Sequence, residues 1–153
     1  MNNASTSVSA VLFDLDGTLL DTAPDFFNAI NRLRAEENLD SADYITVRNT
    51  VSSGAAALVE ACFSLNREDH RFAPLLERLL DHYEADIGDA STLFESLDSL
   101  LQWLEDRKIK WGIVTNKPQR FTLPLLRQLN LDRRCATVIC PDQVSHRKPH
   151  PES

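Results

Sequence analysis

The sequence has few of the residues from which several common binding sites are built. Its 153 residues include four glycines, and their spacing forms neither GxGxxG nor GxxxxGK[ST]: Gly17, Gly54, Gly88 and Gly112. The usual cradles for dinucleotides and nucleoside triphosphates are therefore excluded. The three cysteines are odd in number and include no close CxxC pair: Cys62, Cys135 and Cys140. We therefore expect free thiols, rather than a disulfide framework or a structural zinc site.

Positive charge and long apolar runs are also scarce. Lysine and arginine total 16 against 23 acidic residues, which gives a formal net charge of -7 and a pI near 5.0. No basic patch is dense enough to release phosphate counterions, so we expect no nucleic-acid partner and no acidic membrane surface. The first nine residues have neither a basic start nor a long apolar stretch. They predict no signal peptide and no membrane anchor, and we expect a cytoplasmic protein.

Two aspartates at the end of a short apolar run form the strongest chemical signal. Residues 10–20 read AVLFDLDGTLL, so Asp14 and Asp16 follow a predicted strand. Side chains two residues apart on a strand share a face, and Gly17 allows a sharp turn there. Ligands of open α/β sheets bind beyond the carboxyl ends of the strands, where an isolated carboxylate pair would repel itself. We therefore predict that Mg²⁺ neutralises the pair.

The remaining pattern predicts an α/β protein with a helical insert. Thr22 and Asp25 are spaced like a capping box at the start of a helix near Ala23. No convincing strand lies between about 40 and 90, where three helices are predicted, over about 45–51, 55–63 and 72–87. Helices then alternate with two short apolar strands, at 110–115 and 136–140. Because such crossovers are right-handed, we expect three parallel strands whose carboxyl ends meet at one edge.

The histidines and tryptophans are interpreted as structural residues. The two tryptophans, Trp103 and Trp111, are expected to fill core space. The histidines are expected to be surface groups and not metal ligands: His70, His82, His146 and His150.

Three stretches in chain order resemble the motifs of the haloacid dehalogenase superfamily of phosphohydrolases. They are DLDGT at 14–18, TNKP at 115–118 and KPHPE at 148–152. The resemblance implies a Rossmann-like parallel sheet, of which this chain holds the first three core strands, over 1–21 and 91–153. Residues 22–90 look like the family's helical type-one cap, inserted just after the first motif.

The resemblance also implies a role for each motif residue. Asp14 would attack phosphorus to give an aspartyl-phosphate, and Asp16 would exchange protons with the leaving alkoxide and the hydrolytic water. Mg²⁺ would be held by Asp14 and by the backbone carbonyl of Asp16. The Thr115 hydroxyl would hold phosphoryl oxygens, and Lys148 would supply positive charge. Both cations are needed, because a carboxylate about 4 Å from a phosphate is repelled by about 4 kcal/mol per charge pair at an effective dielectric of 20.

Further residues are assigned to the substrate. Gly17, Thr18 and Asn116 would shape the phosphate cradle. The helix junction near Arg48, Ser52, Ser53 and Gly54 would contact the rest of the substrate, and an exposed polar turn is the alternative interpretation of that junction.

The resemblance narrows the reaction and the substrate class. Asp16 argues against a dehalogenase, because halide leaves without protonation, and Thr18 argues against the sugar phosphomutases. The stretches at 21–25, 53–54, 114–118 and 139–142 look most like phosphoglycolate phosphatases, and among them like enzymes acting on N-acetylmuramic acid 6-phosphate in cell-wall recycling. The implied substrate is a small phosphorylated metabolite.

The chain departs from the family pattern at its carboxyl end. It stops just after the third motif, so the family's fourth, acidic motif is absent, and we expect an incomplete chain. Residues 11–13 would then form an exposed apolar sheet edge, which invites pairing with a complementing C-terminal fragment or with another copy. The alternative to a phosphatase is a non-catalytic remnant that binds a partner.

Overall fold

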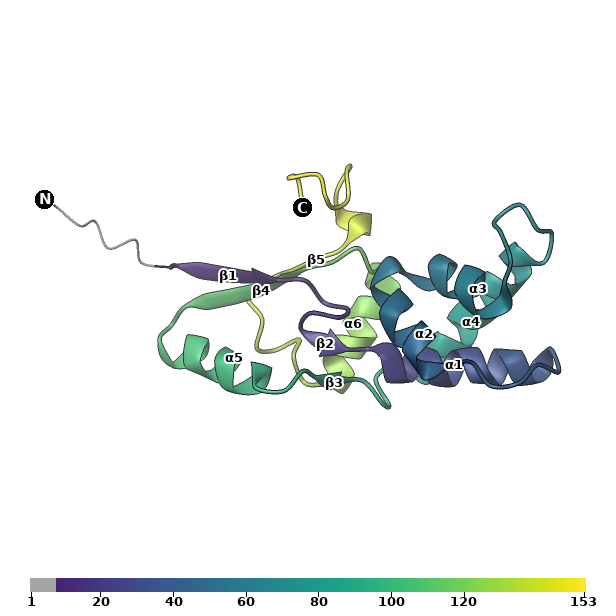
Figure 1. Ribbon diagram of the computed structural model, residues 1–153. Coiled ribbons are helices and arrows are strands. Elements are labelled where there is room, and N and C mark those ends of the chain that lie inside the picture. Colours follow the sequence, from purple (N-terminus) through teal and green to yellow (C-terminus); the bar gives the residue numbers. More distant parts are fainter. Residues whose placement is uncertain (1–7) are drawn as a thin grey trace, which may run out of the picture.

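A three-stranded parallel sheet forms the centre of the protein. The structure, a computed structural model, describes residues 8–153, so the predicted absence of a leader falls largely outside the described residues. The strand order is β1 (Ala10–Phe13), β4 (Lys110–Val114), β5 (Val138–Ile139), and both pairings are parallel. Figure 1 shows the three strands running side by side. The predicted α/β fold with a parallel sheet is confirmed.

Strand β1 lies at one edge of this sheet. Within residues 8–153 it pairs only with β4, with Val11 opposite Trp111 and Phe13 opposite Ile113. The side chains of β1 alternate between exposed and half-buried, and Leu12 is 61% exposed. The sheet therefore has the open, apolar edge that the sequence predicts.

Two helices cover one face of the sheet. They are α5 (Leu97–Asp106) and α6 (Gln119–Gln128), and they lie on the same side of β1 and β4 in Figure 1. Apolar side chains from both helices pack with the strands in one cluster, which includes Leu101, Leu125, Trp111 and Ile113. The expectation for Trp103 is wrong: this side chain is 47% exposed, and the Arg107 guanidinium lies 4.2 Å from its ring centroid.

The other helices gather at one end of the sheet around a second apolar cluster. They are α1 (Ala23–Glu36), α2 (Tyr44–Thr50), the short 3₁₀ helix η1 (Val51–Ser53), α3 (Ala55–Phe63) and α4 (Phe72–Ala85). Their bounds follow the apolar periodicity closely, and α3 coincides with the predicted 55–63. The domain boundaries at 21 and 91 stay a prediction. No helix within residues 8–153 is long and apolar enough to cross a bilayer.

A small antiparallel pair joins the two ends of the helical segment. Strand β2 (Leu20–Asp21) enters this segment, β3 (Thr92–Leu93) leaves it, and Leu20 pairs with Leu93. The sequence analysis predicts neither strand, because a two-residue strand has no measurable apolar periodicity. A further 3₁₀ helix, η2 (Pro141–Gln143), follows β5.

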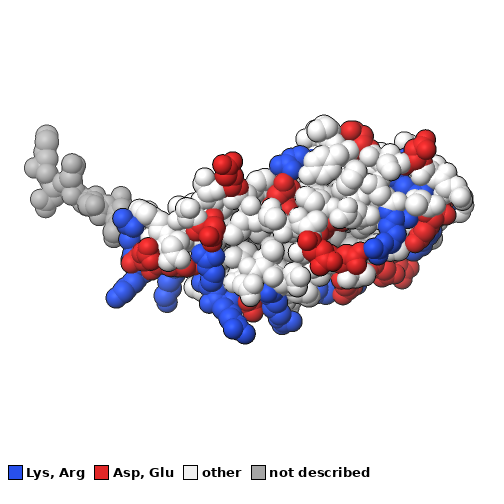
Figure 2. All heavy atoms as spheres, turned by 90° about the horizontal axis from the view of Figure 1, so that it is seen from below, with Lys and Arg blue, Asp and Glu red and all other residues white. Residues whose placement is uncertain are grey.

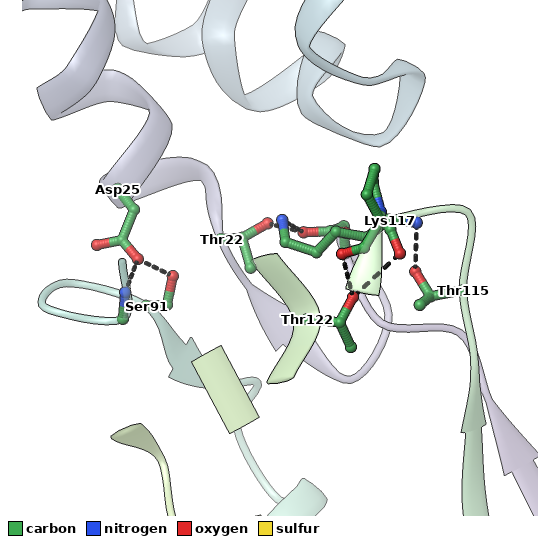
Figure 3. A network of polar contacts seen from close by, with 9 residues as sticks. Thr22, Asp25, Ser91, Thr115, Lys117 and Thr122 are labelled. Carbon is green, nitrogen blue, oxygen red and sulfur yellow. Dashed lines mark hydrogen bonds and ion pairs between the residues drawn. The ribbon is translucent and has the colours of Figure 1, made fainter. Parts of the chain in front are cut away.

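The predicted capping box at the start of α1 is wrong. Thr22 is the N-cap residue, but its side chain makes no cap hydrogen bond. The Asp25 carboxylate instead accepts hydrogen bonds from the backbone N–H groups of Gly88 (2.8 Å) and Ala90 (2.7 Å) and from the Ser91 hydroxyl. Figure 3 shows Asp25 and Ser91 facing each other. Asp25 therefore fastens the returning segment to the start of α1.

This buried carboxylate gives the first testable prediction. In Asp25→Ala, three donors lose their acceptor, and hydrogen bonds to charged groups are worth about 1.5–3 kcal/mol each. We expect urea denaturation to show a free energy of unfolding lower by about 4–5 kcal/mol, the low end of that range for three bonds. The matched control is Asp89→Ala, an exposed carboxylate in the same loop, which should leave the midpoint almost unchanged. Equal effects of the two substitutions would contradict the assignment.

Candidate functional site

The carboxyl ends of the three strands meet, and the site begins there. Asp14 follows β1 and Thr115 follows β4. Lys148, 134 residues after Asp14, donates from Nζ to Asp14 Oδ1 at 2.6 Å and to the Val114 carbonyl oxygen at 2.7 Å. The side chains of Asp14 and Lys148 are 43% and 29% exposed. A carboxylate and an ammonium group are therefore held together where a ligand from solvent can reach both.

Asp16 lies in a different environment from Asp14. Its Oδ1 accepts hydrogen bonds from the Thr22 hydroxyl (2.8 Å) and from Lys117 Nζ (3.0 Å). The Asp16 side chain is 17% exposed and that of Lys117 only 5%. In Figure 3 the Lys117 side chain reaches from the loop after β4 towards Thr22. The two aspartates are therefore each paired with their own lysine, one pair open and the other almost buried.

Lys117 is the residue that the sequence analysis misses. Its Nζ lies 4.5 Å from the ring centroid of Tyr83 on α4 and 5.1 Å from that of Phe26 on α1. The two rings stack on each other, with centroids 3.9 Å apart. A desolvated cation against an aromatic face is worth about 2 kcal/mol. The only sequence signal was its place in the TNKP stretch, which says nothing about its partners.

Tyr83 is held neutral beside this cation. Burial raises the pKa of the Tyr83 hydroxyl well above its usual value, and the charges of Asp16 and Asp25 raise it further. Among the described residues the hydroxyl has no hydrogen-bond partner. The ring therefore acts on Lys117 through its face, and a helix of the insert is tied to the loops at the sheet edge.

Thr115 and Asn116 organise the loop after β4. Thr115 is buried, and its hydroxyl oxygen accepts a hydrogen bond from the Lys117 backbone N–H at 3.0 Å, which leaves the hydroxyl proton for another acceptor. The exposed Asn116 amide donates to the Lys148 carbonyl oxygen at 3.2 Å. The Asp142 carboxylate, in η2, accepts a hydrogen bond from the Gln119 backbone N–H at the start of α6.

The helix junction approaches the first motif at one point. Gly17 has a φ of +76°, a conformation that favours glycine, and the nearest atom that an added Cβ would meet is Ser52 Oγ of η1. Ser53 and Gly54, which come after Ser52, are exposed, and so is Thr18 in the first motif. Arg48 donates to the Asp21 carboxylate at 2.6 Å. The structure thus brings Ser52 against the loop, while the substrate contacts expected of Arg48, Ser53, Gly54 and Thr18 stay predictions.

The oxygen atoms near Asp14 are of the chemical type that binds a hard cation such as Mg²⁺. The exposed carboxylate of Asp14 and backbone oxygens of its loop are the ligands that Mg²⁺ accepts, with water and phosphate completing the shell. Asp16 has one carboxylate oxygen engaged twice, so its backbone carbonyl is the better donor. Within residues 8–153, three potential side-chain ligands of the His, Cys, Asp and Glu type come together only elsewhere, at His146, His150 and Glu152.

Comparisons with known proteins identify the family to which the chain is similar. The family description "Haloacid dehalogenase-like hydrolase" matches residues 11–153. The chain is 45% identical over 143 residues to an N-acetylmuramic acid 6-phosphate phosphatase of Pseudomonas putida, covering 94% of this chain. It is 42% identical over 142 residues to a phosphoglycolate phosphatase of Xanthomonas campestris, covering 93%. The chain spans 64% of the length of each of these relatives.

A solved structure shows the same fold. The crystal structure of a predicted phosphoglycolate phosphatase from Haemophilus somnus superposes with a TM-score of 0.79 at 25% sequence identity. It covers 96% of this chain and 68% of that protein.

The buried ion pair gives the second prediction. Removing one partner of a buried pair leaves the other charge uncompensated, which costs about 3–5 kcal/mol. Asp16 keeps 17% exposure, so we expect Lys117→Met to lower the free energy of unfolding by about 2–3 kcal/mol. The control is Lys110→Met at an exposed position of β4. Adding Asp16→Asn to Lys117→Met should restore part of the loss, and strictly additive losses would show that the pair is not coupled.

Proposed function

Because the chain belongs to the haloacid dehalogenase-like hydrolase family, we propose that it carries the site of a phosphomonoester hydrolase. The observation that carries this proposal is the contact between Asp14 Oδ1 and Lys148 Nζ, 2.6 Å apart at the open edge of the sheet. A nucleophilic carboxylate needs such a neighbour, because the approaching phosphate repels it unless positive charge lies close.

Asp14 acts as the nucleophile in this proposal. One of its carboxylate oxygens attacks phosphorus, the bond to the leaving oxygen breaks, and an aspartyl-phosphate forms. The Lys148 ammonium and the Thr115 hydroxyl proton stabilise the charge on the phosphoryl oxygens. Water then attacks the same phosphorus, which releases inorganic phosphate and restores the Asp14 carboxylate. Mg²⁺ held by Asp14 and the Asp16 carbonyl would supply further positive charge at the phosphate.

Asp16 handles the protons. Lys117 and Thr22 both bind its Oδ1, which leaves Oδ2 to carry a proton to the leaving alkoxide and to take one from the hydrolytic water. The two donors fix the carboxylate orientation, so the reacting oxygen is always the same one. The two roles account for the exposed position of Asp14 and for the fixed orientation of Asp16.

The proposed substrate is a small phosphorylated metabolite. The names of the relatives suggest phosphoglycolate or N-acetylmuramic acid 6-phosphate. A sugar phosphomutase is the less favoured reaction, and isomerised sugar phosphate in place of free phosphate would identify it. The expected cytoplasmic location and the expected absence of a nucleic-acid partner stay predictions. On the face seen in Figure 2, acidic and basic side chains lie intermingled.

The nucleophile is tested with phosphate release from both candidate substrates and from p-nitrophenyl phosphate. We expect Asp14→Asn to lose at least about a thousandfold in rate, since no covalent intermediate can form. Chelation of Mg²⁺ should lower the wild-type rate, and adding Mg²⁺ back should restore it. Asp89→Asn, an exposed carboxylate far along the chain, is the control. Equal rates for Asp14→Asn and wild type would end the proposal.

A second candidate function is that of a partner-dependent or non-catalytic binding unit. The edge position of β1 favours it: within residues 8–153 this strand pairs only with β4, so its outer backbone groups, beside the exposed Leu12, can accept a further strand. We propose that the edge pairs either with a complementing fragment or with a second copy of this chain.

Sedimentation at several protein concentrations tests the pairing. Leu12→Lys places a charge on the edge and should reduce any concentration-dependent dimer at least severalfold, since edge lysines block strand pairing. Leu100→Lys, on the exposed side of α5 and 39% exposed in the wild type, is the matched control. A wild type that stays monomeric at every concentration would exclude the second copy as the partner.

A further inference from the structure

Three potential metal ligands converge in the segment after η2. One ligand atom each from His146, His150 and Glu152 lie within 4.8 Å of one another, and all three side chains are exposed. The rings of His146 and His150 have centroids 4.5 Å apart. The sequence analysis treats these histidines as separate surface groups, although they are four residues apart and the chain folds them onto each other.

Hydrogen bonds within the segment hold the three groups in place. The Glu152 carboxylate accepts from the backbone N–H groups of Ser145 and His146, both at 2.9 Å. One of its oxygens also lies 3.0 Å from His146 Nδ1. The Glu152 backbone N–H donates to His150 Nδ1 at 3.2 Å. The ligands are therefore already gathered, so an ion would not have to order a flexible chain.

We propose that His146, His150 and Glu152 bind a divalent transition-metal ion of the Zn²⁺, Co²⁺ and Ni²⁺ class. Imidazole nitrogens prefer these ions, whereas Mg²⁺ prefers an all-oxygen shell. Two imidazoles and one carboxylate supply three ligands and leave open positions for water. Metal binding needs neutral imidazoles, and the ion competes with the 3.0 Å contact between His146 Nδ1 and Glu152.

The position of the site gives it a consequence for the sheet edge. Lys148 lies between the two histidines in the chain, and its Nζ contacts Asp14 Oδ1 and the Val114 carbonyl oxygen. An ion joining residues 146, 150 and 152 restricts the loop that presents this ammonium group. The metal site itself does not depend on the proposed phosphatase activity. Only the significance of a restricted Lys148 loop for catalysis rests on that proposed function.

Metal binding to the whole chain tests the proposal. Calorimetry with ZnCl₂ in chelator-treated buffer should show one equivalent bound, and Co²⁺ should give the visible absorption of a nitrogen- and oxygen-ligated site. His146→Ala, His150→Ala and Glu152→Gln should each weaken binding by about tenfold or more. His70→Ala, whose side chain is 92% exposed, is the control and should bind as the wild type does. Far-UV circular dichroism checks that each variant is folded.

Three results would overturn the proposal. One is the absence of Zn²⁺ and Co²⁺ binding to the wild type. Another is unchanged affinity in the double variant H146A/H150A. The third is a site placed elsewhere: binding lost in Asp14→Asn but kept in His146→Ala would place the ion at the sheet edge, and a thiolate absorption band lost in Cys135→Ser would place it at a cysteine.

Discussion

The ion pair between Lys117 and Asp16 is the contact on which the arrangement of the site depends. It joins the loop after β1 to the loop after β4, and the rings of Phe26 and Tyr83 close over the ammonium group. The Lys117 side chain is only 5% exposed, and burying its charge costs desolvation free energy. The Asp16 carboxylate and the two aromatic faces offset this cost, so the ammonium group is stable there only while they stay in place. This charge is therefore one of the contacts that hold the helices of the insert at the edge of the sheet.

The same pair separates the two aspartates of the first motif. Asp14 faces solvent with Lys148, and Asp16 faces the interior with Lys117 and Thr22. Two carboxylates two residues apart repel each other, and here each one contacts a lysine of its own instead of its neighbour. A nucleophile and a proton carrier need such different surroundings, since one must reach phosphorus and the other must keep one oxygen aimed at the leaving group.

The segment that carries Lys148 is held from two directions. Asn116 binds the Lys148 carbonyl oxygen from the loop after β4, and Glu152 closes the segment on itself through Ser145 and His146. Lys148 thus reaches Asp14 from a loop that is ordered mainly by local polar contacts. Asp14 directly follows the edge strand β1, so a strand added at this edge would also affect the site.

The sequence by itself determined the order of the helices and of the three strands of the parallel sheet, and the residues that follow those strands. Apolar periodicity is a local property, so α1, α3 and α4 could be placed within a few residues, and Asp14 and Thr115 could be assigned to one edge of a parallel sheet. The family resemblance carried by three short motifs was confirmed for the same reason, because each motif is contiguous in the chain.

Only the tertiary structure decided which polar groups bind one another. Thr22 and Asp25 had the spacing of a helix cap, yet the stronger partners were Asp16 and the loop at 88–91. The same holds for Lys117, which meets a carboxylate 101 residues away. A polar side chain takes the best donor or acceptor within reach, and what lies within reach is set by the packing of distant elements rather than by neighbours in the sequence.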